Sequence, residues 1–191
     1  MKPDKDEIKD ICISVLVLSL IFSRLVPAEN FLTSLEYSIL ITIFCFVIHE
    51  FAHRFVANYY GFAARYVAWP LGLVIALFLS VFGIVFAAPG AVYVFPYSPK
   101  FAFEVRPLTR RENALISLAG PLSNLVTGAV FLLLSLISPA WLFLAIAHFS
   151  FYLAFFNLLP VPPLDGSKVF AWNSKIYLAV LALSAFLTFL A

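Results

Sequence analysis

The segment FVIHEFAHRF, residues 46–55, places His49, Glu50 and His53 within a long apolar stretch in the pattern H-E-x-x-H. On an α-helix, residues four positions apart lie on the same face, so the two imidazoles can bind one metal ion together. Glu50 follows the first histidine directly, where its carboxylate can reach a metal-bound water molecule and accept a proton. This spacing predicts a catalytic zinc centre with one Zn²⁺ per chain.

A purely structural metal site is the alternative interpretation of the same motif. Such a site would use His49 and His53 but would give Glu50 no role. A carboxylate within an apolar helix is costly, so its presence would then need a separate explanation. We therefore favour catalysis, with Glu50 as the general base.

A catalytic zinc site usually has three protein ligands and an open position for water, so one more ligand is needed. Asp165, in the segment NLLPVPPLDG, is the only one of four aspartates beyond the first ten residues. His148 is the competing candidate, in the middle of an apolar segment. Glu104 and Glu112 are weaker candidates, because nearby arginines can pair with them. We favour Asp165, because its apolar segment and that of the H-E-x-x-H motif are both predicted to run towards the inner membrane face.

The composition predicts an all-α polytopic membrane protein. Of the 191 residues, 63% are hydrophobic and 12% are charged, whereas soluble domains usually carry about 25% charged residues. The net charge is only +2, so no nucleic-acid partner is expected and the lipid bilayer is the expected surroundings. Residues 1–191 are interpreted as a single transmembrane domain.

About five to six transmembrane helices are expected, because a span needs roughly 20 apolar residues. The catalytic core is predicted at about 36–170, with peripheral spans at about 11–27 and 175–191. The individual apolar blocks are at about 11–27, 36–59, 67–97, 113–137, 140–159 and 175–191.

Lysine and arginine positions predict a multi-pass protein of the cell membrane with a cytoplasmic N-terminus, since basic residues favour the inner side. Lys2, Lys5 and Lys9 precede the first span, and the loop 98–112 is also basic. The N-terminal segment and the loop 98–112 can both be cytoplasmic only if block 67–97 enters the membrane and returns to the same side. We therefore expect a helix of about 71–87 and an extended, re-entrant return, with a full span as the alternative.

The paired motifs HEFAH and NLLPVPPLDG resemble the signatures of the site-2 protease family of intramembrane zinc metalloproteases, H-E-x-x-H and N-x-x-P-x-x-x-x-D-G. The segment AGPLSN, residues 119–124, is similar to the start of the middle core helix of that family. The resemblance covers about 36–66 and 110–170. Many members carry a PDZ domain, and none is expected in this chain.

The resemblance implies that His49, His53 and Asp165 bind zinc and that Glu50 is the general base and acid. It implies that Asn157 stabilises the oxyanion or holds the substrate backbone. The implied reaction is cleavage of a transmembrane segment of a membrane-bound substrate, as in regulated intramembrane proteolysis. The family usually has a β-hairpin-like segment after the motif helix.

A substrate helix must unwind before its carbonyl can be attacked, because its backbone hydrogen bonds are otherwise all made within the helix. An exposed protein strand can hold the unwound segment by edge pairing. The segments YVAWP, residues 66–70, and AVYVF, residues 91–95, are the candidate strands.

Two other functions remain possible from the sequence. One is a non-proteolytic membrane protein that binds or carries zinc, which needs the ligands but no base. The other is a different membrane metallopeptidase with a glutamate as the third ligand. A zinc carrier differs from an intramembrane peptidase of the site-2 type in giving Glu50 no catalytic role. A different metallopeptidase would differ from it in the identity of the third ligand.

Overall fold

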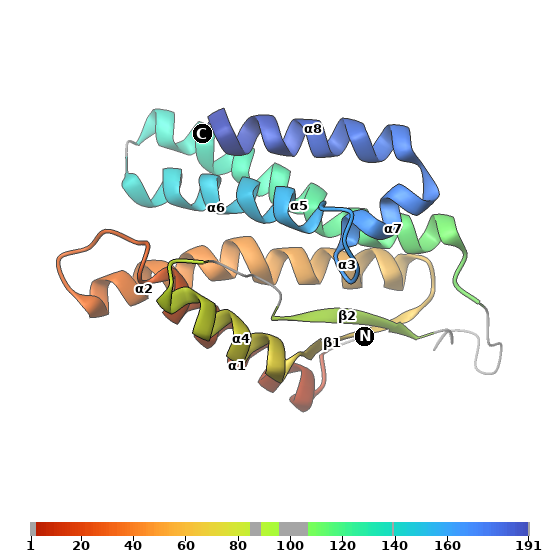
Figure 1. The fold of residues 1–191 in the computed structure, drawn as a ribbon, viewed down its shortest axis with the longest axis horizontal. Coiled ribbons are helices and arrows are strands. Elements are labelled where there is room, and N and C mark those ends of the chain that lie inside the picture. The colour runs from red at the N-terminus through yellow and green to blue at the C-terminus, as the bar shows by residue number, and fades with distance from the viewer. Residues whose placement is uncertain (1–2, 85–88, 96–106, 139, 191) are drawn as a thin grey trace.

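The computed structural model describes residues 3–84, 89–95, 107–138 and 140–190. These residues form a predominantly helical structure with one small sheet (Figure 1). The elements in chain order are α1 (Lys5–Phe22), α2 (Phe31–Thr42), η1 (Ile43–Val47), α3 (Ile48–Tyr59), β1 (Ala63–Ala68), α4 (Pro70–Val81), β2 (Gly90–Phe95), α5 (Arg110–Ile137), α6 (Trp141–Asn157), α7 (Asp165–Trp172) and α8 (Ser174–Leu190).

The H-E-x-x-H motif lies in a continuous helix of 29 residues, Phe31–Tyr59, that comprises α2, η1 and α3. Asn30 caps its start, with its side-chain oxygen accepting the Thr33 N–H at 3.0 Å. The middle part, η1, is a π-helix that ends directly before α3. Such π turns are rare and frequently mark functional sites. The local widening of the helix therefore lies directly before the turn that carries the first predicted metal ligand, His49.

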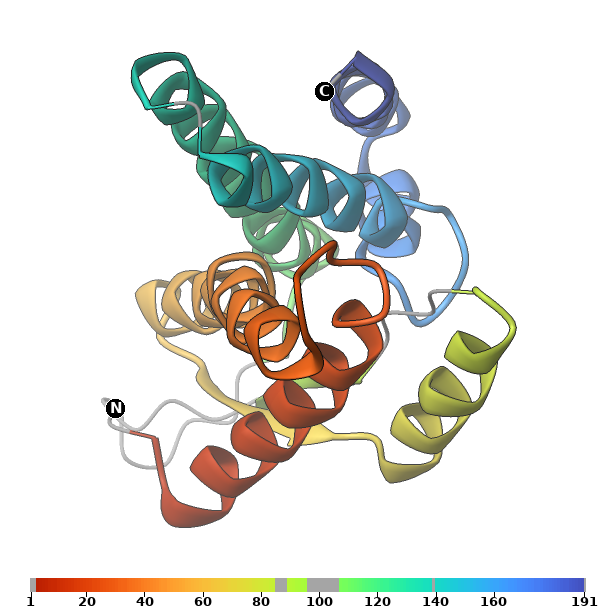
Figure 2. The same ribbon diagram turned by 90° about the vertical axis from the view of Figure 1, so that its left-hand side faces the viewer.

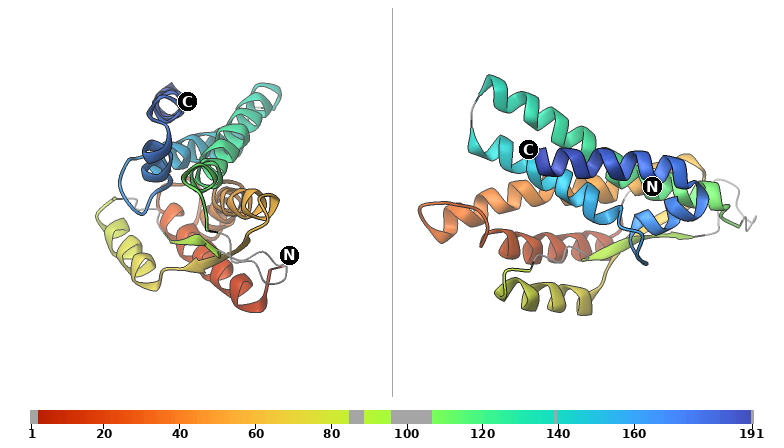
Figure 3. Two further views of the ribbon diagram at one scale, coloured as in Figure 1. Left: turned by 90° about the vertical axis from the view of Figure 1, so that its right-hand side faces the viewer. Right: turned by 45° about the horizontal axis from the view of Figure 1, so that its top comes forward.

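Helix α5 is at the centre of the structure and packs against α3, α6 and α7. It starts at a capping box in which Thr109 and Glu112 bond to each other's backbone N–H groups, an arrangement that fixes a helix start. The views in Figures 2 and 3 show α5, α6 and α8 on one side of α3, and α1, α4 and the sheet on the other.

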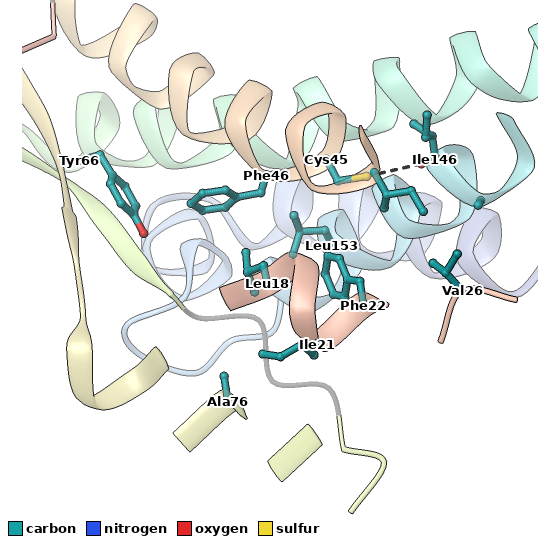
Figure 4. Close-up of a cluster of buried hydrophobic side chains, with 12 residues drawn as sticks. Leu18, Ile21, Phe22, Val26, Cys45, Phe46, Tyr66, Ala76, Ile146 and Leu153 are labelled. Atoms are coloured by element: carbon teal, nitrogen blue, oxygen red, sulfur yellow. Dashed lines mark hydrogen bonds between the residues drawn. The ribbon is translucent and has the colours of Figure 1, made fainter. Parts of the chain in front are cut away.

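The hydrophobic core between these two groups is built from α1, α2, η1, β1, α4 and α6 (Figure 4). Phe46 packs edge-on against Tyr66, with the ring centroids 5.6 Å apart. Small polar residues accompany the apolar ones, as where Ser19 of α1 bonds to Thr42 of α2 at 3.1 Å. Small hydroxyl residues let helices approach closely and are typical of helix contacts in membranes.

Strands β1 and β2 form a two-stranded antiparallel sheet in which Tyr66 pairs with Val92 and Ala68 with Gly90. The predicted segment 91–95 lies within β2, and residues 66–68 of the predicted segment 66–70 lie in β1, which starts earlier, at Ala63. Trp69 and Pro70 instead lead into helix α4, which lies between the two strands in the chain. The β-hairpin-like segment is therefore present, with a helix in place of a tight turn. The expected helix of about 71–87 is shorter in the structure and covers Pro70–Val81.

The prediction of five to six membrane spans is not supported. Two helices, Phe31–Tyr59 and Arg110–Ile137, are long and apolar enough to cross a membrane. The apolar helices α4, α6 and α8 are shorter, at 10–17 residues. Seventeen residues at 1.5 Å each reach about 25 Å, short of the hydrocarbon core of about 30 Å. The blocks 67–97 and 140–159 were longer than α4 and α6 because they included turn residues at 82–83 and 158–159.

Two further differences concern the ends of the chain. Helix α1 begins at Lys5, earlier than the expected start near residue 11, so it includes charged residues. The short helix α7 was not predicted and precedes α8. Residues 98–106 of the basic loop 98–112 lie outside the described residues.

Candidate metal centre

Two helices, α3 and α7, carry the predicted ligands. Helix α3 presents His49 and His53 on one buried face, with Glu50 buried beside them. Asp165 is the first residue of α7, directly after the proline-rich segment that follows α6. The peptide bond between Pro162 and Pro163 in that segment is cis. After α6 the chain turns back through this segment and brings the carboxylate of Asp165 to the two histidines of α3.

The three predicted ligands meet in space. Oδ2 of Asp165 lies 3.0 Å from Nε2 of His53 and 3.5 Å from Nε2 of His49. The two Nε2 atoms are 3.0 Å apart. All three residues are buried, and their ligand atoms lie within 4.8 Å of one another. This group is able to hold a metal ion.

The donor atoms fit zinc in both number and spacing. Zinc bonds to histidine nitrogen and carboxylate oxygen at about 2.0–2.1 Å, so tetrahedral ligand atoms lie about 3.3 Å from each other. The distances in the group, 3.0 to 3.5 Å, bracket that value. Two buried imidazole nitrogens and a carboxylate supply a donor set with one negative charge, which a divalent cation stabilises.

The backbone of α5 fixes the orientation of His53. Its Nδ1 lies 2.7 Å from the carbonyl oxygen of Ile116. A carbonyl only accepts hydrogen bonds, so Nδ1 carries the proton and Nε2 keeps its lone pair. That lone pair faces Asp165 and His49. Hydrogen bonding at the outer nitrogen is the usual way in which proteins orient a metal-binding histidine.

Asp165 has a charged neighbour on its own helix. Nζ of Lys168 donates a hydrogen bond to Oδ1 at 3.3 Å, while Oδ2 faces the histidines. Burial raises the pKa of this carboxyl, but the adjacent histidines and Lys168 lower it by more, and the balance lies below its ordinary value. The carboxylate is therefore held in the ionised form that a metal ligand needs.

A cavity of about 80 Å³ adjoins the three residues and has room for several water molecules. Glu50 lines the same cavity, and its Oε2 is buried without a hydrogen-bond partner among the described residues. A buried carboxylate oxygen without a partner is costly, so its position needs a specific explanation. The cavity walls come from α3, β2, α5, α6, α7 and the residues before α7.

Asn157 lines the same cavity, at the end of α6. Its Nδ2 donates a hydrogen bond to the carbonyl oxygen of Leu153 at 3.0 Å. An amide nitrogen carries two hydrogens. One therefore anchors the side chain to its own helix, and the second is available to another acceptor.

The competing ligand candidates are not part of the group. His148 is exposed on α6, and its ring packs edge-on to Phe149. The carboxylate of Glu112 is engaged in the capping box of α5. Glu104 lies outside the described residues. Within the described part of the chain, the potential metal ligands that gather are therefore His49, His53 and Asp165.

Two contacts of this centre were not predicted. Asn124 of α5 lies 3.0 Å from Nδ1 of His49, and Lys168 bonds to Asp165. A signal for the first was present in AGPLSN, where Gly120 and Asn124 are four residues apart and so share a helix face. The signal for the contact between Lys168 and Asp165 is their three-residue spacing, which places both side chains on one face of a helix.

Two curated proteins are similar to this chain over most of its length. "Putative zinc metalloprotease MJ0611" of Methanocaldococcus jannaschii is 40% identical over 181 residues, covering 91% of this chain and 88% of that protein. "Putative zinc metalloprotease YwhC" of Bacillus subtilis is 30% identical over 153 residues, covering 72% and 69%. No protein-family model and no solved structure matches the chain. The identity and coverage show that the chain belongs to the zinc metalloprotease family of these two proteins.

Proposed function

We propose that this protein is an intramembrane zinc endopeptidase of the site-2 protease type, which cleaves a transmembrane segment of a membrane-bound substrate. The observation that carries the proposal is the position of Glu50. Its carboxylate lines the cavity beside the group formed by His49, His53 and Asp165. A structural metal site has no use for a buried carboxylate oxygen without a partner, whereas a peptidase needs one as a base.

His49, His53 and Asp165 would hold the zinc ion, which is the cofactor that the donor set favours. When bound, zinc polarises a carbonyl group and lowers the pKa of a water molecule. Three protein ligands leave a position free, as in catalytic rather than structural zinc sites. The other parts of the mechanism follow from the residues around the cavity.

Glu50 would accept a proton from a water molecule in the cavity as that water attacks the scissile carbonyl. It would then deliver the proton to the nitrogen of the departing amine, so that one carboxylate serves as base and then as acid. The cavity in which this water would lie is lined by helices and β2. The expected products are a new carboxylate and a new amine.

Asn157 would stabilise the oxyanion that develops on the attacked carbonyl. Its first amide hydrogen is bonded to Leu153, so the side chain has little freedom to turn away. Its second hydrogen is then a fixed donor within the cavity. Preorganised donors of this kind lower the barrier because they need no reorientation during the reaction.

A membrane location is supported by the surface of the helices as well as by their length. Beyond the two helices that are long enough to span, large apolar side chains are exposed on several elements. Soluble monomers rarely expose apolar patches of such extent. Examples that are at least 60% exposed are Phe55, Leu71, Phe78, Leu133 and Phe186. We place the protein in the cell membrane with its N-terminus on the cytoplasmic side, where basic residues are favoured.

The sheet offers a place for an unwound substrate. Strand β1 is closed on its outer edge, because the N–H groups of Tyr66 and Ala68 donate to carboxylates of Glu7 and Asp10 on α1. In the described residues the sheet has two strands, so the outer edge of β2 has no further strand beside it.

The free edge of β2 can be assigned to particular residues. Trp69 N–H donates to the Pro89 carbonyl, and N–H groups of alternate residues point to the same side of a strand. In this register the backbone groups of Gly90, Val92 and Val94 face away from β1. These three residues also line the cavity. We propose that the substrate adds to β2 as a further strand.

Reconstitution tests the proposal. The purified chain is placed in lipid vesicles with a single-span substrate, and products are mapped by mass spectrometry with and without a zinc chelator. The proposal predicts a cut within the apolar segment that stops with the chelator and returns with added zinc. Zinc transport across the vesicle without any cut would instead identify a zinc carrier.

A further inference from the structure

Asn124 is fully buried on α5 and contacts His49 of the metal centre. In the structure its Nδ2 lies 3.0 Å from Nδ1 of His49. Its Oδ1 is buried and has no hydrogen-bond partner among the described residues. A buried amide oxygen without a donor is unusual, so the contact between the two side chains needs an explanation.

The orientation of the amide determines which nitrogen of His49 carries the proton. With Nδ2 facing the ring, Asn124 donates to Nδ1, and the neutral imidazole must then carry its proton on Nε2. That tautomer has no lone pair for a metal ion on the side of His53 and Asp165. With Oδ1 facing the ring, Nδ1–H donates to the amide oxygen and Nε2 is free to bind. The two amide orientations have the same shape, so the hydrogen bonding decides between them.

We propose that Asn124 is the positioning residue of His49: its Oδ1 accepts the hydrogen of Nδ1 and so fixes the tautomer whose Nε2 binds zinc. The inference rests on the zinc centre proposed above but not on peptide hydrolysis. It gives His49 the same kind of outer partner that the Ile116 carbonyl gives His53, and it gives the buried Oδ1 a donor.

The geometry of the helix pair supports this role. Ile116, Gly120 and Asn124 are spaced four residues apart and so lie on one face of α5, opposite His53 and His49 on the packed helix α3. Gly120 lies between the two acceptors. A Cβ added at Gly120 would lie 2.6 Å from Nε2 of His49 and closer still to Nε2 of His53. The glycine thus allows α5 close enough for both acceptors to reach the rings.

The test compares two substitutions of similar size. Asn124→Asp keeps an acceptor oxygen but loses the amide donor, while Asn124→Leu loses both. Zinc affinity is measured in detergent by competition with a chromophoric chelator. We expect zinc binding to weaken about 10- to 100-fold in Asn124→Leu, the usual effect of losing an outer partner of a histidine ligand. In Asn124→Asp we expect it to stay within a few-fold of the parent.

A spectroscopic measurement follows the proton itself. The chain has three histidines, so their ¹⁵N-labelled rings can be assigned by single substitution of each. In the zinc-loaded parent and in Asn124→Asp, the Nδ1–H of His49 should exchange slowly with solvent. In Asn124→Leu it should exchange faster, while the Nδ1–H of His53, bonded to Ile116, remains slow.

Several results would overturn the inference. They are parent-like zinc affinity in Asn124→Leu, equal losses in both variants, or loss of zinc in Asn124→Asp alone. If Asn124→Leu does not fold, Asn124→Asp alone tests the inference. A carboxylate can replace an amide that accepts a hydrogen bond but not one that donates, so retained zinc affinity supports the inference and lost affinity overturns it. Neither measurement uses a substrate. Failure of the vesicle cleavage assay with zinc binding intact would therefore refute the peptidase proposal and leave this one standing.

Discussion

Oδ2 of Asp165 lies 3.0 Å from Nε2 of His53, although the sheet, α5 and α6 separate the two residues in the chain. The contact joins the first residue of α7 to the middle of α3. It depends on the antiparallel course of α5 and α6, which carries the chain away from α3 and back again. The metal centre is therefore a product of the tertiary fold and does not exist in the motif helix alone.

Removing the Asp165 carboxylate should remove the metal. In Asp165→Ala, two histidines remain as ligands, and we expect zinc affinity to fall more than about 100-fold, beyond the usual effect of losing an outer partner. Zinc content is measured by mass spectrometry after equilibrium dialysis. Glu112→Ala is the matched control, because it removes a carboxylate from the capping box. It should lower stability slightly, because one of the two reciprocal capping contacts is lost, and leave zinc bound. Loss of zinc in the control, but not in Asp165→Ala, would favour a glutamate ligand instead.

Gly120→Ala should damage the metal centre selectively. The added Cβ would press on Nε2 of both histidines, so we expect weaker zinc binding in a protein that still folds. Gly128→Ala is a control on the same helix, where a Cβ would meet the ring of Phe151. The control should lower the midpoint of thermal unfolding with unchanged zinc affinity. Equal zinc affinity in the two variants would show that α5 does not approach the ligands as closely as described.

Val92→Pro tests the edge of β2. Proline removes one N–H from the side of β2 that faces away from β1, where a strand tolerates it. A hydrogen bond contributes about 0.5–1.5 kcal/mol, so substrate cleavage should slow by about 2- to 10-fold with zinc content unchanged. Val92→Ala keeps the N–H and should cleave at nearly the parent rate. A larger defect in Val92→Ala than in Val92→Pro would assign the effect to the side chain and contradict strand addition.

The ion pair between Glu7 and Arg54 should be important for stability. Both side chains are buried, their closest atoms are 2.6 Å apart, and Glu7 also accepts the N–H of Tyr66. In Glu7→Ala, Arg54 loses this carboxylate at a buried site, which typically costs about 3–5 kcal/mol. The neighbouring Asp6 is 81% exposed and lies 3.8 Å from Arg65, so Asp6→Ala should cost less than about 1 kcal/mol. Thermal unfolding in detergent gives the comparison, and similar shifts in both variants would argue against the buried pair.

The local part of the metal centre could be predicted from the sequence. A helix fixes the spacing of His49 and His53, so H-E-x-x-H specifies two ligands and a neighbouring carboxylate without knowledge of the fold. Asp165 could be singled out because it is the one aspartate far from the N-terminus. The strands that flank α4 were recognisable in part, since β-branched and aromatic residues are concentrated in the predicted segments 66–70 and 91–95.

The remaining features depend on contacts between distant elements. Nothing local to Glu7 shows that it pairs with Arg54. The spacing of Gly120 and Asn124 places them on one helix face but does not show that His49 lies opposite Asn124. The structure supports fewer spans than the apolar blocks predicted, because hydropathy does not show where a helix ends. In the structure, the turns at residues 82–83 and 158–159 use residues that the apolar blocks 67–97 and 140–159 had included.

The most direct test of the central claim is the turnover of Glu50→Gln on a membrane-spanning substrate, measured together with its zinc content. Glutamine has the same shape as glutamate but cannot accept the proton. The account predicts that zinc content matches the parent while cleavage falls by at least about 10²- to 10⁴-fold, the usual contribution of a general base. Parent-like turnover in a zinc-loaded Glu50→Gln protein would contradict it.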